Sequence, residues 1–218
     1  VDNLGDVVTE LTNQGIDKVN STISYTLTAN VEQLFLTGIA GLSGIGNNLN
    51  NIIYGNNGNN QLSGGAGNDS LNGGLGNDTL EGGAGNDTLV GGDGNDIYVF
   101  GINSGRDVID NKDSAGNDLL LLDAGITAEQ VWLRQTGNNL EVSLIGTSQK
   151  VVLTDWYVNA PSSQKTNFQL ATGGTLLATE VQALVNAMAA FAPPPLGQTS
   201  LTTAQHQALD SVIAANWG

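Results

Sequence analysis

A nine-residue repeat constrains this sequence more strongly than any other feature. Residues 64–72 read GGAGNDSLN, residues 73–81 GGLGNDTLE, residues 82–90 GGAGNDTLV and residues 91–99 GGDGNDIYV. All four units follow G-G-x-G-x-D-x-U-x, where U is a large apolar residue. Such a short, regular period predicts a solenoid in which the repeats stack on one another. A flexible linker rich in Gly, Asn and Asp is the alternative, but it does not explain why the Asp and the apolar position are fixed.

The residue types within one repeat predict a tight turn followed by a short strand. Gly, Asn and Asp favour turns and tolerate positive φ angles. The last three residues, such as Thr79, Leu80 and Glu81, form a strand in which only the middle side chain points inward. Two repeats then complete one coil with two facing strands. The inward side chains are predicted to be Leu62, Leu71, Leu80, Leu89 and Tyr98.

Stacking also brings carboxylates into line along the edges of the coil. Turns two repeats apart lie about 4.8 Å apart, so Asp69 is expected over Asp87, and Asp78 over Asp96. Two carboxylates at that distance repel by about 3 kcal/mol at an effective dielectric constant of 20. A core one side chain thick buries too little apolar surface to offset the entropy of ordering so much Gly. We therefore expect a divalent cation, and Ca²⁺ rather than Mg²⁺, because Ca²⁺ accepts many oxygen ligands in irregular geometry.

Charge and composition narrow the classes of partner. The 218 residues include 21 acidic and 6 basic side chains, for a net charge of −15. This excess argues against nucleic acids and anionic membranes as partners and favours cations. The absence of Cys removes disulfides, thiolate zinc sites and cysteine nucleophiles. No apolar run approaches the length of about 18 residues that suggests a membrane-spanning helix, and Val1 begins no charged-then-apolar leader.

Over residues 46–118 the sequence closely resembles the haemolysin-type calcium-binding (RTX) family, and both flanks resemble the regions around such repeats. The resemblance implies an all-β fold, a right-handed parallel β-roll (β-solenoid) with a strand-rich C-terminal cap and one or two short terminal helices. In that family, the first and third carbonyls of a loop bind one ion, the second and fourth bind its neighbour, and the Asp bridges both. Carried over, one site comprises Gly64, Ala66, Asp69, Gly83, Gly85 and Asp87, and the site on the opposite edge comprises Gly73, Leu75, Asp78, Gly92, Gly94 and Asp96. The other loop carbonyls assigned to neighbouring ions are those of Gly65, Gly67, Gly74, Gly76, Gly82, Ala84, Gly91 and Asp93.

The ion stack is predicted to extend in both directions. Downstream, Asp87 with Asp107 and Asp96 with Asp118 could each hold another ion, and Gly105 and Gly116 precede these acids in G-x-D sequences. Upstream, two units keep the spacing but replace the Asp by Asn, so they should form weaker or empty sites. The residues of these weaker sites are Asn48, Asn51, Asn57 and Asn60. We expect about four well-formed Ca²⁺ sites and up to six in all.

The flanks divide the chain into further parts: an N-terminal solenoid-like segment at 1–45, the roll at 46–118, a cap at 119–192, and a spacer with a tail at 193–218. In the first part, strands are expected near Gly5–Val8, Gly15–Val19, Ile23–Leu27 and Val31–Leu36. Asp17 there could bind an ion or be a solvated turn residue. The start at Val1, without a Met, suggests a fragment of a longer chain.

The C-terminal parts are expected to close the roll. Apolar strands at 119–122, 131–133, 140–144 and 151–153 predict a cap that nucleates the roll and covers its exposed edge. A helix capped by Thr179 is predicted over 179–191 and a second helix within 201–218, with Leu209, Val212 and Ile213 on one face. The resemblance implies that this tail is an uncleaved signal for a type I secretion apparatus.

The sequence leaves three classes of function to compare. The first is a calcium-dependent folding and secretion module of a bacterial protein that is secreted, extracellular or on the cell surface. The second is an adhesin or surface-layer module that binds a cell-surface or glycan ligand; its aromatic candidates are Trp132, Trp156, Tyr157 and Trp217, although core positions are expected for the first three. The third, an enzyme, is not expected, because His206 is the only His and the paired Asp residues are assigned to calcium. Any catalytic domain would lie upstream of Val1.

Overall fold

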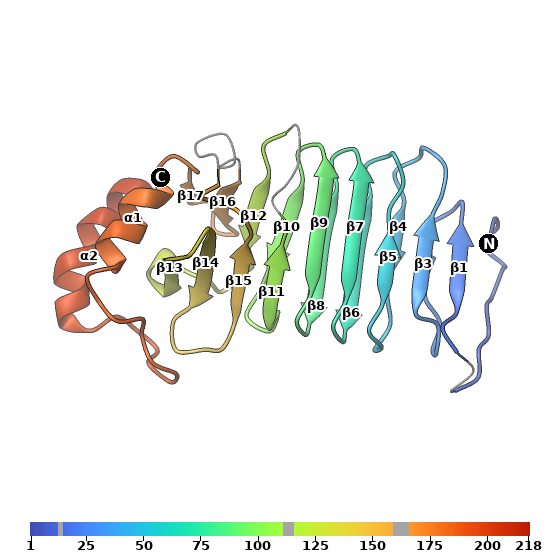
Figure 1. The fold of residues 1–218 in the computed structure, drawn as a ribbon, viewed down its shortest axis with the longest axis horizontal. Helices are drawn as coiled ribbons and strands as arrows, with labels where there is room; N and C mark the ends of the chain where they lie inside the picture. The colour runs from blue at the N-terminus through green and yellow to red at the C-terminus, as the bar shows by residue number, and fades with distance from the viewer. Residues whose placement is uncertain (13–14, 111–115, 159–165) are drawn as a thin grey trace.

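Short parallel strands separated by Gly- and Asn-rich turns build two facing sheets. The computed structural model describes residues 1–12, 15–110, 116–158 and 166–218. Figure 1 shows the strands side by side along a rod, with the N-terminus at one end and two helices at the other. Within the described residues, one sheet has nine strands and the other has eight. The chain is therefore a parallel β-solenoid, as its repeat predicts.

Odd-numbered and even-numbered strands alternate between the sheets along most of the rod. The nine-stranded sheet has the order β1 (Lys18–Ser21), β3 (Gln33–Leu36), β5 (Ile52–Tyr54), β7 (Ser70–Leu75), β9 (Thr88–Asp93), β11 (Arg106–Ile109), β15 (Lys150–Leu153), β14 (Asn139–Leu144) and β13 (Val131–Thr136). The eight-stranded sheet has the order β17 (Thr175–Leu176), β16 (Asn167–Leu170), β12 (Leu119–Leu122), β10 (Ile97–Phe100), β8 (Thr79–Ala84), β6 (Gln61–Ala66), β4 (Ser43–Ile45) and β2 (Tyr25–Thr26).

The register of the strands follows the repeat. Leu62 pairs with Leu80 in one sheet, and Leu71 pairs with Leu89 in the other. The five predicted inward side chains are all buried, with exposed fractions of 2% or less. Strands β6 to β9 are longer than the predicted three residues, because pairing continues into the Gly-rich turns.

The N-terminal flank continues the solenoid, as expected. Strand β1 pairs in parallel with β3, and β2 pairs in parallel with β4. The strand expected at Gly5–Val8 is wrong, because residues 1–12 contain no strand. Leu4 and Val7 are exposed instead of facing the core. This segment lies against the first strands through several hydrogen bonds; the Val8 N–H, for example, donates to the Tyr25 hydroxyl at 3.2 Å.

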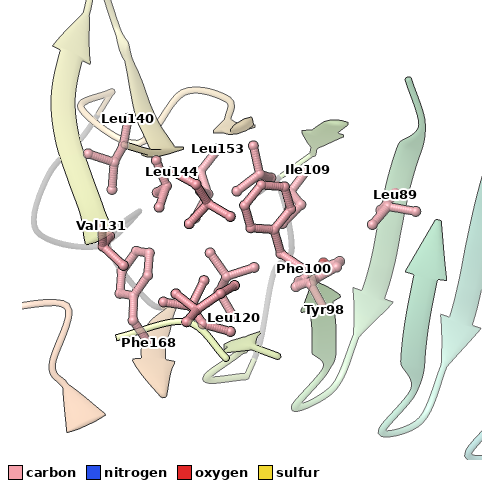
Figure 2. Close-up of a cluster of buried hydrophobic side chains, with 14 of the residues drawn as sticks. Leu89, Tyr98, Phe100, Ile109, Leu120, Val131, Leu140, Leu144, Leu153 and Phe168 are labelled. Carbon is pink, nitrogen blue, oxygen red and sulfur yellow. The ribbon is translucent and has the colours of Figure 1, made fainter. Parts of the chain in front are cut away.

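The C-terminal strands extend both sheets and then change direction. Strand β15 pairs in parallel with β11, whereas β14 and β13 follow in antiparallel order. Figure 2 shows side chains from both sheets, including Phe100, Ile109, Leu120 and Phe168, converging on one apolar cluster where the repeats meet these strands. Trp156 is fully buried beside Phe168, with ring centroids 5.9 Å apart. The fully buried aromatic side chains therefore lie in β10 and in the C-terminal part of the rod beyond it.

Among the described residues after β12, three elements are helical: η1 (Ala128–Gln130), α1 (Val181–Met188) and α2 (Thr203–Asn216). Helix α1 falls within the predicted range but is not capped by Thr179. Its N-cap is Glu180, which has helical φ and ψ angles and makes no side-chain cap. The Glu180 carboxylate instead accepts the Leu177 N–H at 3.0 Å, which moves the helix start one residue along the chain.

The C-terminal tail is folded against the cap. Helix α2 begins at a capping box made by Thr202 and Gln205, and it buries Leu209 and Ile213. Residues of α2 contact α1, and the Gly218 N–H donates to the carbonyl of Thr175 at 3.0 Å. Among the described helices, none is long and apolar enough to cross a membrane.

Candidate calcium-binding edges

Buried aspartates stack along both edges of the solenoid in two lines. The first Asp ladder is Asp69, Asp87 and Asp107, and the second Asp ladder is Asp78, Asp96 and Asp118. Within a ladder, the backbone N–H of each Asp donates to Oδ1 of the next. The N···O distances are 2.7 and 3.0 Å in the first ladder, and 2.8 and 3.0 Å in the second. The stacking predicted from the nine-residue period is thus confirmed, including its extension across the irregular spacing beyond residue 99.

The second carboxylate oxygen of the central aspartates has no partner. All six ladder residues are at most 3% exposed. Oδ2 is buried and receives no hydrogen bond within the described structure in Asp69, Asp78 and Asp87. A buried carboxylate oxygen without a donor is costly, and a native fold normally satisfies it with a donor, a water or an ion.

Burial has a clear effect on the acidity of these groups. It raises the pKa of Asp69 to about 6, and the neighbouring Asp87 carboxylate acts in the same direction. Burial likewise raises the pKa of Asp78 to about 6 and that of Asp107 to about 7. In each case the backbone N–H from the preceding coil lowers the pKa but is outweighed. Without a cation, the edges therefore resist carrying their negative charge at neutral pH.

The Oδ2 atom of each repeat Asp faces the backbone of its own turn. The Oδ2 atoms of Asp69, Asp78, Asp87 and Asp96 lie where a Cβ would stand on Gly64, Gly73, Gly82 and Gly91, respectively. Only a glycine leaves room for the carboxylate at that first position. The invariant first Gly and the Asp five residues later thus form one cradle.

The second and fourth glycines bring neighbouring turns into close contact. Gly83 and Gly85 have φ angles of +95° and +154°. A side chain on either would overlap the carbonyl oxygen of Gly65 or Gly67 in the preceding coil. The carbonyl oxygens of one turn therefore lie directly against the backbone of the next, beside the buried carboxylates.

The structure brings the predicted ligand sets together in pairs of neighbouring turns. Gly65 pairs with Gly83 and Ala66 with Ala84. On the opposite edge, Gly74 pairs with Gly92 and Leu75 with Asp93. Some of the assigned carbonyls already accept backbone N–H groups: Ala84 accepts from Gly67 at 2.9 Å, Asp93 from Gly76 at 3.0 Å and Gly85 from Arg106 at 3.1 Å. Each carbonyl oxygen keeps a second lone pair for another contact.

The downstream turns join the same edges. Gly105 bridges to Gly85, and Asp107 lies two residues further on, in the first ladder. Gly116, with a φ angle of +128°, precedes Asp118 in the second ladder. Asp107 and Asp118 lack the glycine found five residues before the Asp in the repeats, because position 102 is Ile and position 113 is Asp. Position 113 lies outside the described residues.

The donor set fits Ca²⁺. It consists of carboxylate and carbonyl oxygens from flexible turns, the ligands that this hard cation takes in irregular geometry. Across the described ranges, no three Asp, Glu, His or Cys side chains converge on one point. An ion at these edges would therefore depend on backbone carbonyls for most of its ligands, with the ladder aspartates supplying the charge.

The upstream Asn turns are built differently, in a way that the sequence analysis missed. Asn48 and Asn57 are exposed. The residues before them, Asn47 and Asn56, take the second position of each turn and hydrogen-bond into the coil below. The signal was available, since Asn replaces the Gly of the other repeats at that second position.

A second missed feature is an exposed Asn ladder beside each Asp ladder. The N–H of Asn68 donates to Oδ1 of Asn50 at 2.7 Å, and the N–H of Asn86 donates to Oδ1 of Asn68 at 2.8 Å. The other edge repeats this pattern through Asn59, Asn77, Asn95 and Asn117. The fifth position of the repeat is thus fixed by hydrogen bonding between coils.

The aromatic candidates and His206 lie apart from these edges, whereas Asp17 lies on the edge of the first Asp ladder. Trp132 and Trp156 are in the core, at 2% and 0% exposed, whereas Tyr157 and Trp217 are half-buried. Asp17 is half-buried, and its N–H donates to Oε2 of Glu32 at 2.9 Å. Its Oδ2 is buried and has no hydrogen-bond partner among the described residues, so Asp17 is not a freely solvated turn residue. His206 contacts Asp210 within α2 at 2.8 Å.

Comparison with known proteins agrees with this geometry. A family model described as the RTX calcium-binding nonapeptide repeat (4 copies) matches residues 45–80 and 73–109. These ranges contain the ladder residues Asp69, Asp78, Asp87 and Asp96 and the two Asn turns that precede them. They cover the central coils and leave the N-terminal flank and the C-terminal cap outside the match. The central coils of this chain are therefore similar to RTX calcium-binding nonapeptide repeats.

Proposed function

We propose that this chain is a calcium-dependent folding module of a secreted bacterial protein. The observation that carries the proposal is the set of three buried, unpartnered Oδ2 atoms on Asp69, Asp78 and Asp87. Their carboxylates are held in place by backbone N–H groups on one side only. They are thus positioned for a cation that the rest of the turn helps to bind.

The residues of the chain have separate tasks in this mechanism. Ca²⁺ would supply positive charge and accept oxygen ligands from two neighbouring turns. The ladder aspartates hold negative charge at a fixed spacing, and the glycines allow carbonyl oxygens to approach. Because each Asp is hydrogen-bonded to the next, binding at one coil orders the donor of its neighbour, which favours cooperative folding.

Calcium dependence suits export before folding. Where free Ca²⁺ is scarce, the acidic turns repel one another and the repeats stay unfolded, as passage through a narrow channel requires. Outside the cell, sites with dissociation constants on the order of 10⁻⁴–10⁻³ M fill, and binding contributes folding free energy. We propose the C-terminal tail as the signal for a type I secretion apparatus, with an extracellular or cell-surface destination.

We propose no catalytic role for the chain itself. The buried carboxylates are committed to the coil edges by their backbone hydrogen bonds. The single His contacts an Asp four residues away in the same helix, a pairing common on helix surfaces.

A calcium titration of the full chain tests the proposal. Far-UV circular dichroism in excess chelator should lack most of the strand signal, and Ca²⁺ should restore it in a steep transition. Mg²⁺ at the same concentration is the control and should restore much less. A chain that shows its complete strand signal in chelator would contradict the proposal.

A further inference from the structure

We propose that the side-chain amides of Asn47 and Asn56 take the place of calcium in the first two repeat turns, so that the N-terminal coils, residues 18–62, fold without metal. This inference rests on the proposed function, because it divides the solenoid into a metal-free part and a calcium-dependent part. It replaces the expectation of weak calcium sites at Asn48, Asn51, Asn57 and Asn60.

The amide of Asn47 bridges two carbonyls of the coil below. Its Nδ2 donates to the carbonyl of Thr28 at 2.8 Å and to that of Val31 at 2.7 Å. A single NH₂ group thus satisfies two oxygens three residues apart in one turn. This is the bridging between turns that a cation would provide at the Asp turns.

Asn56 repeats this arrangement on the opposite edge. Its Nδ2 donates to the carbonyls of Thr37 at 3.3 Å and Ala40 at 2.9 Å, again three residues apart. The residue is 7% exposed, so these bonds are shielded from water. The same pair of amide-to-carbonyl hydrogen bonds is therefore found in two separate turns.

The ladder position is also satisfied in these turns. Oδ1 of Asn51 faces the first glycine of its own turn, Gly46, as Oδ2 of Asp69 faces Gly64. In the Asn turn, that oxygen accepts the N–H of Asn47 at 2.7 Å. The corresponding Oδ2 of Asp69 has no donor. Asn60 accepts from Asn56 at 2.8 Å in the same way.

The density of charged residues changes at the boundary between the Asn turns and the Asp turns. Residues 18–63 contain one Lys and one Glu, whereas residues 64–118 contain ten acidic and two basic residues. The neutral ladder residues Asn51 and Asn60 need no counterion. Apart from Asp17 and Glu32, which stack at the N-terminal end of the first edge, the repulsion that a cation must offset begins at the Asp turns.

The N-terminal coils also have a fuller apolar core than the central repeats. Five apolar side chains are buried within residues 18–36: Val19, Leu27, Val31, Leu34 and Leu36. The central repeats contribute one inward apolar side chain for each nine residues. Apolar packing and amide hydrogen bonds together replace the metal in the N-terminal coils.

Hydrogen exchange of the full chain, read by mass spectrometry in excess chelator and in millimolar Ca²⁺, tests the inference. In chelator, amides in the strands of residues 18–62 should exchange at least about 100-fold more slowly than in the unfolded chain. Peptides from 64–110 should exchange rapidly in chelator and slow down with Ca²⁺. Rapid exchange of both parts in chelator, with slowing of both by Ca²⁺, would overturn the inference and leave the proposed function intact. Slow exchange of both parts regardless of Ca²⁺ would overturn the proposed function, and with it the contrast between the two parts.

Two variants test the amide itself. Asn47→Ala should speed exchange at residues 28–31 and 46–51 in chelator by at least about tenfold, while Asn48→Ala, at the exposed neighbouring position, should leave it unchanged. The double variant Asn47→Gly with Asn51→Asp restores the Gly and Asp of a calcium turn, and it should bind one more Ca²⁺ than the wild type by native mass spectrometry. Equal exchange in Asn47→Ala and Asn48→Ala, or no added ion in the double variant, would contradict the role given to the amide.

Discussion

The backbone N–H of Asp69 donates to Oδ1 of Asp87 at 2.7 Å, one full coil further along the chain. This bond joins two residues 18 positions apart and fixes the spacing of their carboxylates. It leaves Oδ2 of each residue unpartnered and buried. This hydrogen bond thus joins neighbouring coils of the solenoid, and it leaves a buried carboxylate oxygen that a cation could bind.

Neutralising one ladder carboxylate should weaken the response to calcium. Asp78→Asn removes a negative charge from a buried position that pairs with Asp96. We expect the Ca²⁺ midpoint for folding, followed by circular dichroism, to rise by about three- to tenfold. Glu81→Gln removes the same charge from an exposed strand position and should leave the midpoint within error. Equal midpoints for the two variants would contradict the role of the ladder.

The metal-free chain should become less stable as the pH rises. The pKa values of Asp69 and Asp78 are raised to about 6, and that of Asp107 to about 7, chiefly by burial. The metal-free fold therefore prefers protonated carboxyl groups. This contribution to stability is complete below the ordinary Asp pKa of 3.8 and is lost as the pH rises through about 6 to 7.

Circular dichroism in chelator at a series of pH values checks this prediction. The strand signal should be larger near pH 4.5 than near pH 7.5. Saturating Ca²⁺ should remove the difference, because the ion stabilises the ionised form. A strand signal in chelator that grows with rising pH would have the wrong sign for this account.

Crowding between turns should make the repeat glycines irreplaceable. Gly85 has a φ angle of +154°, and a side chain there would overlap the Gly67 carbonyl. We expect Gly85→Ala to lower the free energy of unfolding in Ca²⁺ by about 3 kcal/mol or more. Gly137→Ala is the matched control, since its φ angle is +60° and no atom lies within 4 Å of the added methyl group. Its cost should be about 1 kcal/mol, from backbone conformation alone.

An ion pair in the cap should contribute to stability independently of calcium. Glu141 is 7% exposed and contacts both Arg134 and Lys150 at 2.6 Å. Burial raises its pKa, but the contacts with Lys150 and Arg134 outweigh burial and lower the pKa overall. We expect Glu141→Gln to cost about 1–2 kcal/mol in urea unfolding, because both basic partners are partly exposed.

The control for that pair is the exposed acid Glu129 in η1. Glu129→Gln should change the free energy of unfolding by less than about 0.5 kcal/mol. The Ca²⁺ midpoint of the Glu141→Gln chain should stay close to that of the wild type. A large shift in that midpoint would link the cap to the calcium edges, against this prediction.

Much of the central fold could be predicted because one period determines it. Once two repeats form a coil, residues 18 positions apart must stack, so the pairing of Asp78 with Asp96 and the burial of Leu80 follow directly. The pairing of Asp96 with Asp118 spans 22 positions, and it is predicted by the G-x-D sequence at residues 116–118. These positions are fixed by backbone geometry rather than by distant packing.

The sequence-based predictions were wrong where tertiary contacts determine the local structure. The strand expected at Gly5–Val8 fails because Leu4 and Val7 have no facing sheet to bury them. The predicted cap at Thr179 gives way to Glu180, whose carboxylate instead accepts the Leu177 N–H. The sixth position of the repeat does not predict the role of Asn47, because that role depends on carbonyls 16 and 19 positions upstream.

Anomalous scattering from a crystal of the full chain grown in Ca²⁺ tests the central claim most directly. The account predicts calcium peaks along both edges, beside the Asp69–Asp87 and Asp78–Asp96 pairs, with none at the Asn47 and Asn56 turns. Edges free of any cation at the two Asp pairs, in an otherwise intact solenoid, would contradict it.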